Sequence, residues 1–419
     1  MKTDLKSSTV AFDRRQVYRP FLERLNPIAS LRDLVDRDLI VPRDHDPRDA
    51  GQAPIHIAFA DAAELSRGTQ MALVGGIGSG KTTELLLTQK ILSRHSDAVN
   101  IFVDLADYTD LNELNTGAIL ATVGMQLYSL LKKGNKIPPD EVTSAHAKLR
   151  ELAFGKTKWV PVGDYPGFDE DEEPDRILVK IPGLMRLRFV ALRREVKQVK
   201  ELLLSIASPL LEDGAQITLL IDGLDRLIQA ERFREYAEQD LQALRGSKMT
   251  VIVVAPLLLW YDKSRFLQDY FDLVKHIPAA AADPSDSAFL KQILERRGAL
   301  ELMDRAEVNS IAKYSGGVLR DLLTLARSAA EYAYRDDQDR IGRKHVLAAV
   351  KQLGNRYLVG LGTTHRFRLQ RLAEDKEFPI EDSTARELLV NRQVLEYFSR
   401  GQEFFAVHPA LAKVLPKKE

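Results

Sequence analysis

The sequence predicts an α/β fold in which a parallel β-sheet is followed by a helical region and a small C-terminal module. Three observations predict it. The apolar stretch 71–74 leads into a glycine-rich loop and then a helix-forming segment, the strand–loop–helix order of parallel sheets. A second apolar stretch, 216–222, ends in an aspartate. Amphipathic helical patterns with capping residues fill residues 283–354.

The composition excludes several classes of protein. Sixty Lys and Arg residues balance sixty Asp and Glu residues among 419, so bulk charge gives no footprint for nucleic acid or a membrane. The absence of cysteine excludes disulfides, thiolate metal sites and a cysteine nucleophile. The N-terminal stretch has no apolar secretory segment, and the longest apolar run, 251–261, is too short to cross a bilayer. We therefore expect a cytoplasmic protein without a membrane partner.

Residues 75–82, GGIGSGKT, fit the phosphate-binding P-loop pattern in full. The glycines allow backbone N–H groups to turn inward around an anion, and the helix expected over 82–94 points its positive end at the phosphates. Lys81 is expected to reach the β- and γ-phosphates of ATP, and the Thr82 hydroxyl to hold Mg²⁺. The alternative is a glycine-rich turn before an ordinary helix. The expected ATP-binding residues are Gly75, Gly76, Gly78, Ser79, Gly80, Lys81, Thr82 and Thr83.

A P-loop requires an acidic partner for the metal ion, and the apolar stretch 216–222 supplies one. Its last residue, Asp222, is expected at a strand tip, where it would bind Mg²⁺ through water. Asp225, three residues later, is placed to orient or deprotonate the attacking water. Asp225 has a second interpretation, a salt bridge with Arg226 or with another arginine.

The chain between Lys81 and Asp222 is longer than a compact fold requires. A strand at 99–105 and a helix within 114–131 account for part of it, and residues at about 133–200 are predicted to be an insertion. The insertion contains an acidic loop, 163–175, and a basic helical segment, 186–206. This helix is interpreted as a solvated amphipathic helix; the alternative is a contact with phosphates or with the acidic loop.

The order of the P-loop, the strand ending in Asp222 and the strand at 250–256 resembles the core of the AAA+ and STAND classes of P-loop ATPases. The closest pattern is that of the origin-recognition and transposition-regulator branches. The resemblance covers about residues 50–355 and implies sheet order 5-1-4-3-2, Mg²⁺-dependent ATP hydrolysis and homo-oligomers. One departure concerns Ala255, which stands where AAA+ proteins usually carry a polar residue that positions water. It implies slow turnover.

Two arginines receive roles from the same resemblance. The stretch 314–329 is similar to the lid-helix motif, in which Arg320 would occupy the sensor-2 position and reach the γ-phosphate. The stretch 263–278 resembles the segment that carries an arginine finger, with Arg265 supplied to the nucleotide of a neighbouring subunit. The alternatives are an exposed helix arginine beside Asp321 and an ordinary surface arginine.

Four domains are predicted: an N-terminal arm, 1–50, that docks on the core; an ATPase core, 51–280; a helical lid, 281–355; and a winged-helix-like module, 356–419. In the last, helices over 363–375 and 382–398 precede a turn and a strand. Such modules bind either DNA or proteins. The candidate phosphate contacts are Arg366, Arg368, Arg371, Arg386, Arg392 and Arg400.

Three functions follow from these patterns. The first is an ATP-driven switch that oligomerises and controls a protein effector, as STAND-like ATPases do in bacterial antiviral defence and signalling. The second is a DNA-binding ATPase assembly factor of the replication-initiator or transposition-regulator type. The third, a small-molecule kinase, leaves the lid and the C-terminal module without a role.

Overall fold

The computed structural model describes residues 13–26, 38–49, 51–107, 111, 115–133, 138–154, 157–161, 176–180, 193–227, 230–280, 284–399 and 401–416. The chain divides into two compact units. Unit 1 comprises Met1–Pro54, Gly75–Thr83 and Ile277–Glu419, and unit 2 comprises Ile55–Val74 and Glu84–His276. The predicted acidic loop, 163–175, lies outside the described residues.

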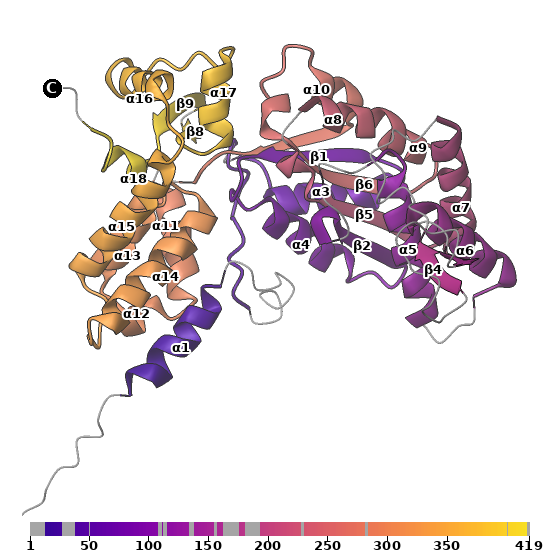
Figure 1. Ribbon diagram of the computed structural model, residues 1–419, viewed down its shortest axis with the longest axis horizontal. Helices are drawn as coiled ribbons and strands as arrows, with labels where there is room; N and C mark the ends of the chain where they lie inside the picture. Colours follow the sequence, from indigo (N-terminus) through magenta and orange to yellow (C-terminus); the bar gives the residue numbers. More distant parts are fainter. Residues whose placement is uncertain are drawn as a thin grey trace, which may run out of the picture. The chain divides into compact units, whose positions relative to one another are not determined.

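A five-stranded sheet forms the centre of unit 2. Its order is β2-β5-β6-β1-β7, and the pairs β2–β5, β5–β6 and β6–β1 are parallel (Figure 1). Read from the other edge, this is the predicted order 5-1-4-3-2, so the predicted P-loop sheet is confirmed. Every residue of β1 and β6 is buried, as expected for central strands covered on both faces. The strands are β1 (Gln70–Gly75), β2 (Ala98–Asp104), β5 (Gln216–Asp222), β6 (Thr250–Ala255) and β7 (Leu273–Ile277).

Three helices of unit 2 pack against one another as a group. Helices α5, α6 and α7 pack against one another through buried residues that include Leu127, Leu149 and Leu203. A Cβ atom at Gly124 of α5 would lie 2.4 Å from Leu149, so glycine allows α5 and α6 to approach closely. The helices of unit 2 are α3 (Ile55–Leu65), α4 (Lys81–Leu92, which begins in the P-loop), α5 (Ala118–Lys133), α6 (Asp140–Phe154), α7 (Arg193–Glu212), α8 (Ala230–Tyr236), α9 (Gln242–Leu244) and α10 (Phe266–Tyr270).

The predicted insertion contains α6, a small antiparallel hairpin of β3 (Thr157–Pro161) and β4 (Arg176–Lys180), and α7. The basic helix is described from Arg193 to Glu212 and so extends past the predicted end at residue 206, whereas residues 186–192 lie outside the described residues. Its apolar stripe is buried against α5 and α6, as an amphipathic helix requires.

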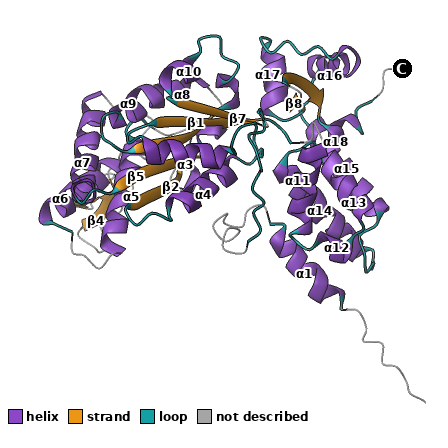
Figure 2. Ribbon diagram, turned by 180° about the vertical axis from the view of Figure 1, so that it is seen from behind, coloured by secondary structure: helices purple, strands orange, loops and turns teal. Residues whose placement is uncertain are grey.

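A helical bundle forms most of unit 1 (Figure 2). In α14, buried Leu322, Leu325 and Ala329 recur at helical spacing and face the same core as α15. The N-terminal helix α1 adds Tyr18 and Phe21 to this core through contacts with α12 and α14. Within the predicted arm, α1 therefore packs on the lid helices, and the docking of the arm on the ATPase core stays a prediction. The helices are α1 (Arg14–Arg24), α11 (Pro284–Glu295), α12 (Ala299–Leu302), α13 (Arg305–Tyr314), α14 (Leu319–Arg335) and α15 (Arg343–Leu358).

The C-terminal module consists of α16 (Thr363–Asp375), α17 (Ser383–Val390), the hairpin of β8 (Val394–Ser399) and β9 (Gln402–Val407), and α18 (Pro409–Ala412). It shares the hydrophobic core of the lid helices through Leu369, Leu388 and Ala410. The predicted helix over 382–398 was wrong in its second half. Helix α17 ends at Val390, and the β-branched and aromatic residues that follow pair as β8 instead.

In the part of the chain that the structure describes, no helix combines the length and apolarity needed to span a membrane.

Candidate nucleotide-binding site

The predicted P-loop connects β1 to α4. Gly78 and Gly80 have φ values of 83° and 107°, a region that residues with a side chain rarely adopt. A Cβ atom at Gly75 would lie 2.6 Å from the carbonyl oxygen of Ile277 and 2.8 Å from Ser79 Oγ. The loop conformation therefore requires glycine at these three positions.

Lys81 is buried inside the loop. Its ammonium group donates hydrogen bonds of 2.8 Å to the carbonyl oxygens of both Gly75 and Gly76. Phosphate oxygens can replace these neutral acceptors with stronger, charge-assisted bonds. Ser79 Oγ is buried and has no hydrogen-bond partner among the residues that the structure describes. A buried cation and an unsatisfied hydroxyl at the start of a helix fit a bound triphosphate.

The outer side of the loop is held by two other segments of unit 1. The backbone N–H of Leu319 donates to the carbonyl oxygen of Gly78 at 2.9 Å. A guanidinium nitrogen of Arg43 donates to the carbonyl oxygen of Ser79 at 3.4 Å. The two bonds fix the orientation of the carbonyl groups of Gly78 and Ser79. Because Leu319 is the first residue of α14, the lid helix begins against the P-loop.

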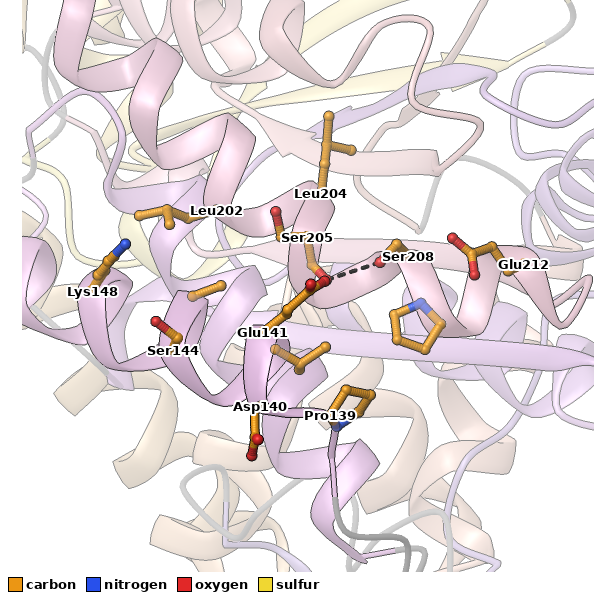
Figure 3. Close-up of a pocket in the computed structure, with 13 residues that line it drawn as sticks. Pro139, Asp140, Glu141, Ser144, Lys148, Leu202, Leu204, Ser205, Ser208 and Glu212 are labelled. Atoms are coloured by element: carbon orange, nitrogen blue, oxygen red, sulfur yellow. Dashed lines mark hydrogen bonds between the residues drawn. The ribbon is translucent and has the colours of Figure 1, made fainter.

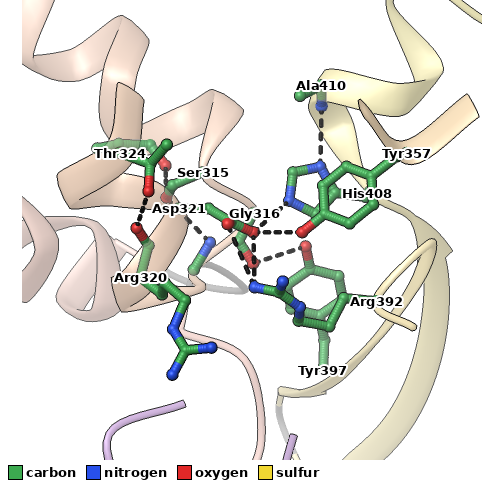
Figure 4. Close-up of polar contacts among 12 residues, drawn as sticks. Ser315, Gly316, Arg320, Asp321, Thr324, Tyr357, Arg392, Tyr397, His408 and Ala410 are labelled. Carbon is green, nitrogen blue, oxygen red and sulfur yellow. Dashed lines mark hydrogen bonds and ion pairs between the residues drawn. The ribbon is translucent and has the colours of Figure 1, made fainter. Parts of the chain in front are cut away.

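Arg320 therefore lies in the first turn of α14, beside the loop. Its Cβ atom lies 3.0 Å from the position that a Cβ atom on Gly78 would occupy, and its side chain is exposed. Figure 4 shows the guanidinium extended away from the buried carboxylate of Asp321. The structure thus brings the predicted lid arginine to the P-loop.

Sequence reasoning missed Arg43. It is buried, and its guanidinium lies 4.9 Å from the ring centroid of Phe289 on α11. The stretch around it is polar, with proline and aspartate but no helical or strand period, so no signal marked this residue.

The predicted acidic strand tip lies in unit 2. Asp222 is the last residue of β5, is buried, and accepts a 2.7 Å hydrogen bond from the backbone of Gly223. Asp225 follows in a short 3₁₀ turn and is half-buried. Arg226, one of the arginines considered as a partner of Asp225, pairs with Asp104 at 3.4 Å.

Asp104 is a second carboxylate that sequence reasoning missed. It ends β2 and is the register partner of Asp222 on β5. Its side chain also lies against Gly223, where a Cβ atom would be 2.7 Å from Asp104 Oδ1. The available signal was the same as for Asp222, an apolar strand closed by an aspartate.

The tip of β6 is apolar, as the sequence implies. Ala255 ends the strand, is fully buried and pairs in register with Val74, the residue before the P-loop. The methyl side chain of Ala255 cannot hold a water molecule by a hydrogen bond.

Arg265 is exposed on unit 2 and caps the start of α10. Its φ of 55° places a non-glycine residue in the left-handed region, which costs conformational energy. Among the described residues its guanidinium has no hydrogen bond or ion pair. Both features suit an arginine that contacts a second molecule.

The six candidate phosphate contacts of the C-terminal module differ in their surroundings. Arg368 pairs with Asp382, and Arg371 with Asp375. Arg386 donates to the carbonyl of Ile380, and Arg392 pairs with buried Asp321. Arg366 is exposed, without an ion pair to any described residue, and Arg400 lies outside the described residues.

A groove of about 910 Å³ lies between α6 and α7 (Figure 3). Carboxylates of Glu141 and Glu212, Lys148 and apolar residues such as Leu202 line it, and none of the predicted site residues does so. It is lined by no glycine-rich loop, and the start of α6 within it carries the acidic residues Asp140 and Glu141, which disfavour a phosphate. Within the described ranges, no group of three or more His, Cys, Asp or Glu side chains could hold a metal ion.

No protein-family model matches the chain, and no curated protein matches it. Solved structures similar to it include Orc1 of Aeropyrum pernix in complex with DNA, with 16% identity over 94% of this chain and 95% of that chain and a TM-score of 0.46. Drosophila ORC bound to DNA gives 15% identity, coverage of 97% and 92%, and a TM-score of 0.42. The RuvB Holliday junction branch migration motor of Thermotoga maritima gives 15% identity, coverage of 87% of this chain and 93% of that chain, and a TM-score of 0.39. The chain is similar to these proteins at low identity.

Proposed function

We propose that the chain is a Mg²⁺-dependent ATPase that works as an assembly switch, with ATP bound in the P-loop. The observation that carries this proposal is the bond from Leu319 N–H to the carbonyl oxygen of Gly78, which joins the start of the lid helix to the phosphate cradle. A change at the phosphates is thereby transmitted to α14 and to the core that α14 shares with the C-terminal module.

In this proposal each site residue has one task. Lys81 exchanges its bonds to loop carbonyls for bonds to the β- and γ-phosphates. The Thr82 hydroxyl and, through water, Asp222 are the groups that would hold Mg²⁺, an ion that retains several waters and needs few protein ligands. When bound there, Mg²⁺ would supply positive charge opposite the phosphates. Asp225 orients or deprotonates the attacking water, and the apolar tip at Ala255 keeps turnover slow.

Two arginines sense the γ-phosphate. Arg320 reaches it from the lid of the same chain and so distinguishes ATP from ADP. Arg265 reaches the nucleotide of a neighbouring copy, which makes hydrolysis depend on a homo-oligomer. The exposure of both side chains supports these roles.

For the output of the switch there are two candidates. The first is duplex DNA, as for an assembly factor of the initiator type; exposed Arg366 on α16 supports it, and two of the similar structures are described as DNA complexes. The second is a protein effector, as in defence or signalling. Phe367 and Phe404, whose side chains are 51% and 42% exposed on the same module, support it.

A paired experiment separates these outputs. A gel shift with duplex DNA, with and without ATP, would give tight and salt-sensitive binding for the first candidate. Mass measurement of the protein alone in ATP would give a larger assembly without DNA for the second. If ATP changes neither DNA affinity nor mass, the chain is not an assembly switch.

A further inference from the structure

The residue after Arg320 is a buried carboxylate with three partners. Asp321 accepts a 2.6 Å hydrogen bond from the Tyr357 hydroxyl and pairs with Arg392 Nη1 at 3.2 Å and His408 Nε2 at 3.3 Å (Figure 4). Tyr357 lies near the end of α15, Arg392 in the turn after α17, and His408 directly before α18. The first turn of the lid helix is therefore tied to three separate parts of the C-terminal third of the chain.

These contacts keep Asp321 ionised. Burial alone would raise the pKa of this carboxyl, but the close approach of the His408 ring, the charge of Arg392 and the hydrogen bond from Tyr357 together hold it below its ordinary value. A buried carboxylate without such partners would cost free energy. The three contacts therefore favour one position of the Asp321 side chain.

Arg392 adds independent support. Its φ of 63° lies in the left-handed region, where glycine would fit with less strain. Only the arginine supplies a guanidinium, which reaches Asp321 and also lies 5.7 Å from the ring centroid of Tyr357. An arginine therefore occupies this strained position, and its side chain contacts Asp321.

The same turn of α14 contacts the P-loop two residues earlier, through Leu319 and Gly78. We infer that Asp321 is a positioning residue for Arg320, and that the C-terminal module, through Arg392 and His408 and together with Tyr357 of α15, sets the ATP selectivity of the site. This inference rests on the proposed ATP-binding function. It makes the module part of the nucleotide sensor as well as its output.

The test is a double-mutant cycle in the full chain, read by the affinities for fluorescent ATP and ADP analogues. Arg392→Gln is expected to lower ATP affinity about tenfold and to leave ADP affinity within about twofold, because Arg320 contacts only the γ-phosphate. Arg320→Ala should give the same pattern. The double variant should bind ATP no more weakly than Arg320→Ala alone, since both changes remove one interaction.

Arg340→Gln is the matched control, because it breaks an exposed arginine–aspartate pair with Asp304 in the same unit; it should change neither affinity. If Arg392→Gln fails to fold, Arg392→Gly removes the guanidinium and relieves the backbone strain. Equal losses for ATP and ADP, or additive losses in the double variant, would overturn the inference. Wild-type protein that binds no ATP would instead refute the proposed function.

Discussion

The backbone N–H of Leu319 lies 2.9 Å from the carbonyl oxygen of Gly78, so the first residue of the lid helix is hydrogen-bonded to the middle of the phosphate loop. The two residues are 241 positions apart in the chain. Because the loop and the helix belong to the same compact unit, a ligand that changes the loop also acts on the lid.

Gly78→Ala should weaken ATP binding about tenfold or more. The added Cβ atom would lie 2.9 Å from Val318 Cγ1 and 3.0 Å from Arg320 Cβ, and the backbone φ of 83° disfavours any side chain. Titration with a fluorescent ATP analogue measures the loss. Gly214→Ala is the control, because its φ is also 83° but no atom lies within 4 Å of the new Cβ. Equal ATP affinity in Gly78→Ala and wild type would contradict the close contact of loop and lid.

Asp225→Asn should leave ATP affinity unchanged and lower turnover about a hundredfold or more, the range expected when a general base is lost. The amide has nearly the shape of the carboxylate but cannot accept a proton from water. Phosphate release under saturating ATP measures turnover. Undiminished release would return Asp225 to a structural role.

Arg265→Ala should slow hydrolysis only in the assembled protein. Its guanidinium is exposed and has no ion pair to another described residue, so its removal should leave the isolated subunit intact. Turnover should be compared at concentrations below and above assembly, as determined by light scattering. The expected result is a loss of about tenfold or more at high concentration alone. An equal loss in the dilute monomer would argue against a role in a neighbouring subunit.

Asp240 should give unit 2 a pH-dependent stability. Burial raises its pKa to about 7, although N–H groups of Gly117 and Ile119, at the start of α5, donate to the carboxylate. The unfolded chain releases this proton near pH 4 and the folded chain near pH 7. Between these values the folded state binds more protons, so this group's contribution to stability falls as pH rises.

The measurement is the thermal midpoint of wild type and Asp240→Asn at pH 5 and pH 8. The wild-type midpoint should fall more between these values than that of the variant, whose amide does not titrate. All other groups are common to both proteins, so their contribution cancels in the difference. Parallel slopes would show that Asp240 does not titrate in this range.

The sequence predicted the parts of the site that are encoded by local patterns. The P-loop and Asp222 were found because a fixed spacing and an apolar strand are both visible within about ten residues, and the sheet order followed from the resemblance. The hairpin strand β8 was missed, because a helical period was read through residues 382–398. Arg43 was missed because its contact with Ser79 depends on how the chain folds back, and no periodicity records that.

The extent of helix α17 shows the same limit. Its N-terminal cap, Asp382, is visible in the sequence and accepts a hydrogen bond from Thr384 N–H in the structure. Its end depends on the pairing of the following residues, as β8, with β9 beyond the turn, which no pattern within 382–398 records. Tertiary pairing therefore decided where the helix stops.

Nucleotide binding by wild type and Lys81→Ala, measured by titration calorimetry in Mg²⁺, tests the central claim most directly. Lys81 is buried and donates hydrogen bonds to the carbonyl oxygens of Gly75 and Gly76, so its loss removes the loop cation that we expect to reach the phosphates. We predict saturable one-to-one ATP binding by wild type and a loss of about a hundredfold or more in the variant. Equal ATP affinity in the two proteins would show that the triphosphate is not bound in this loop.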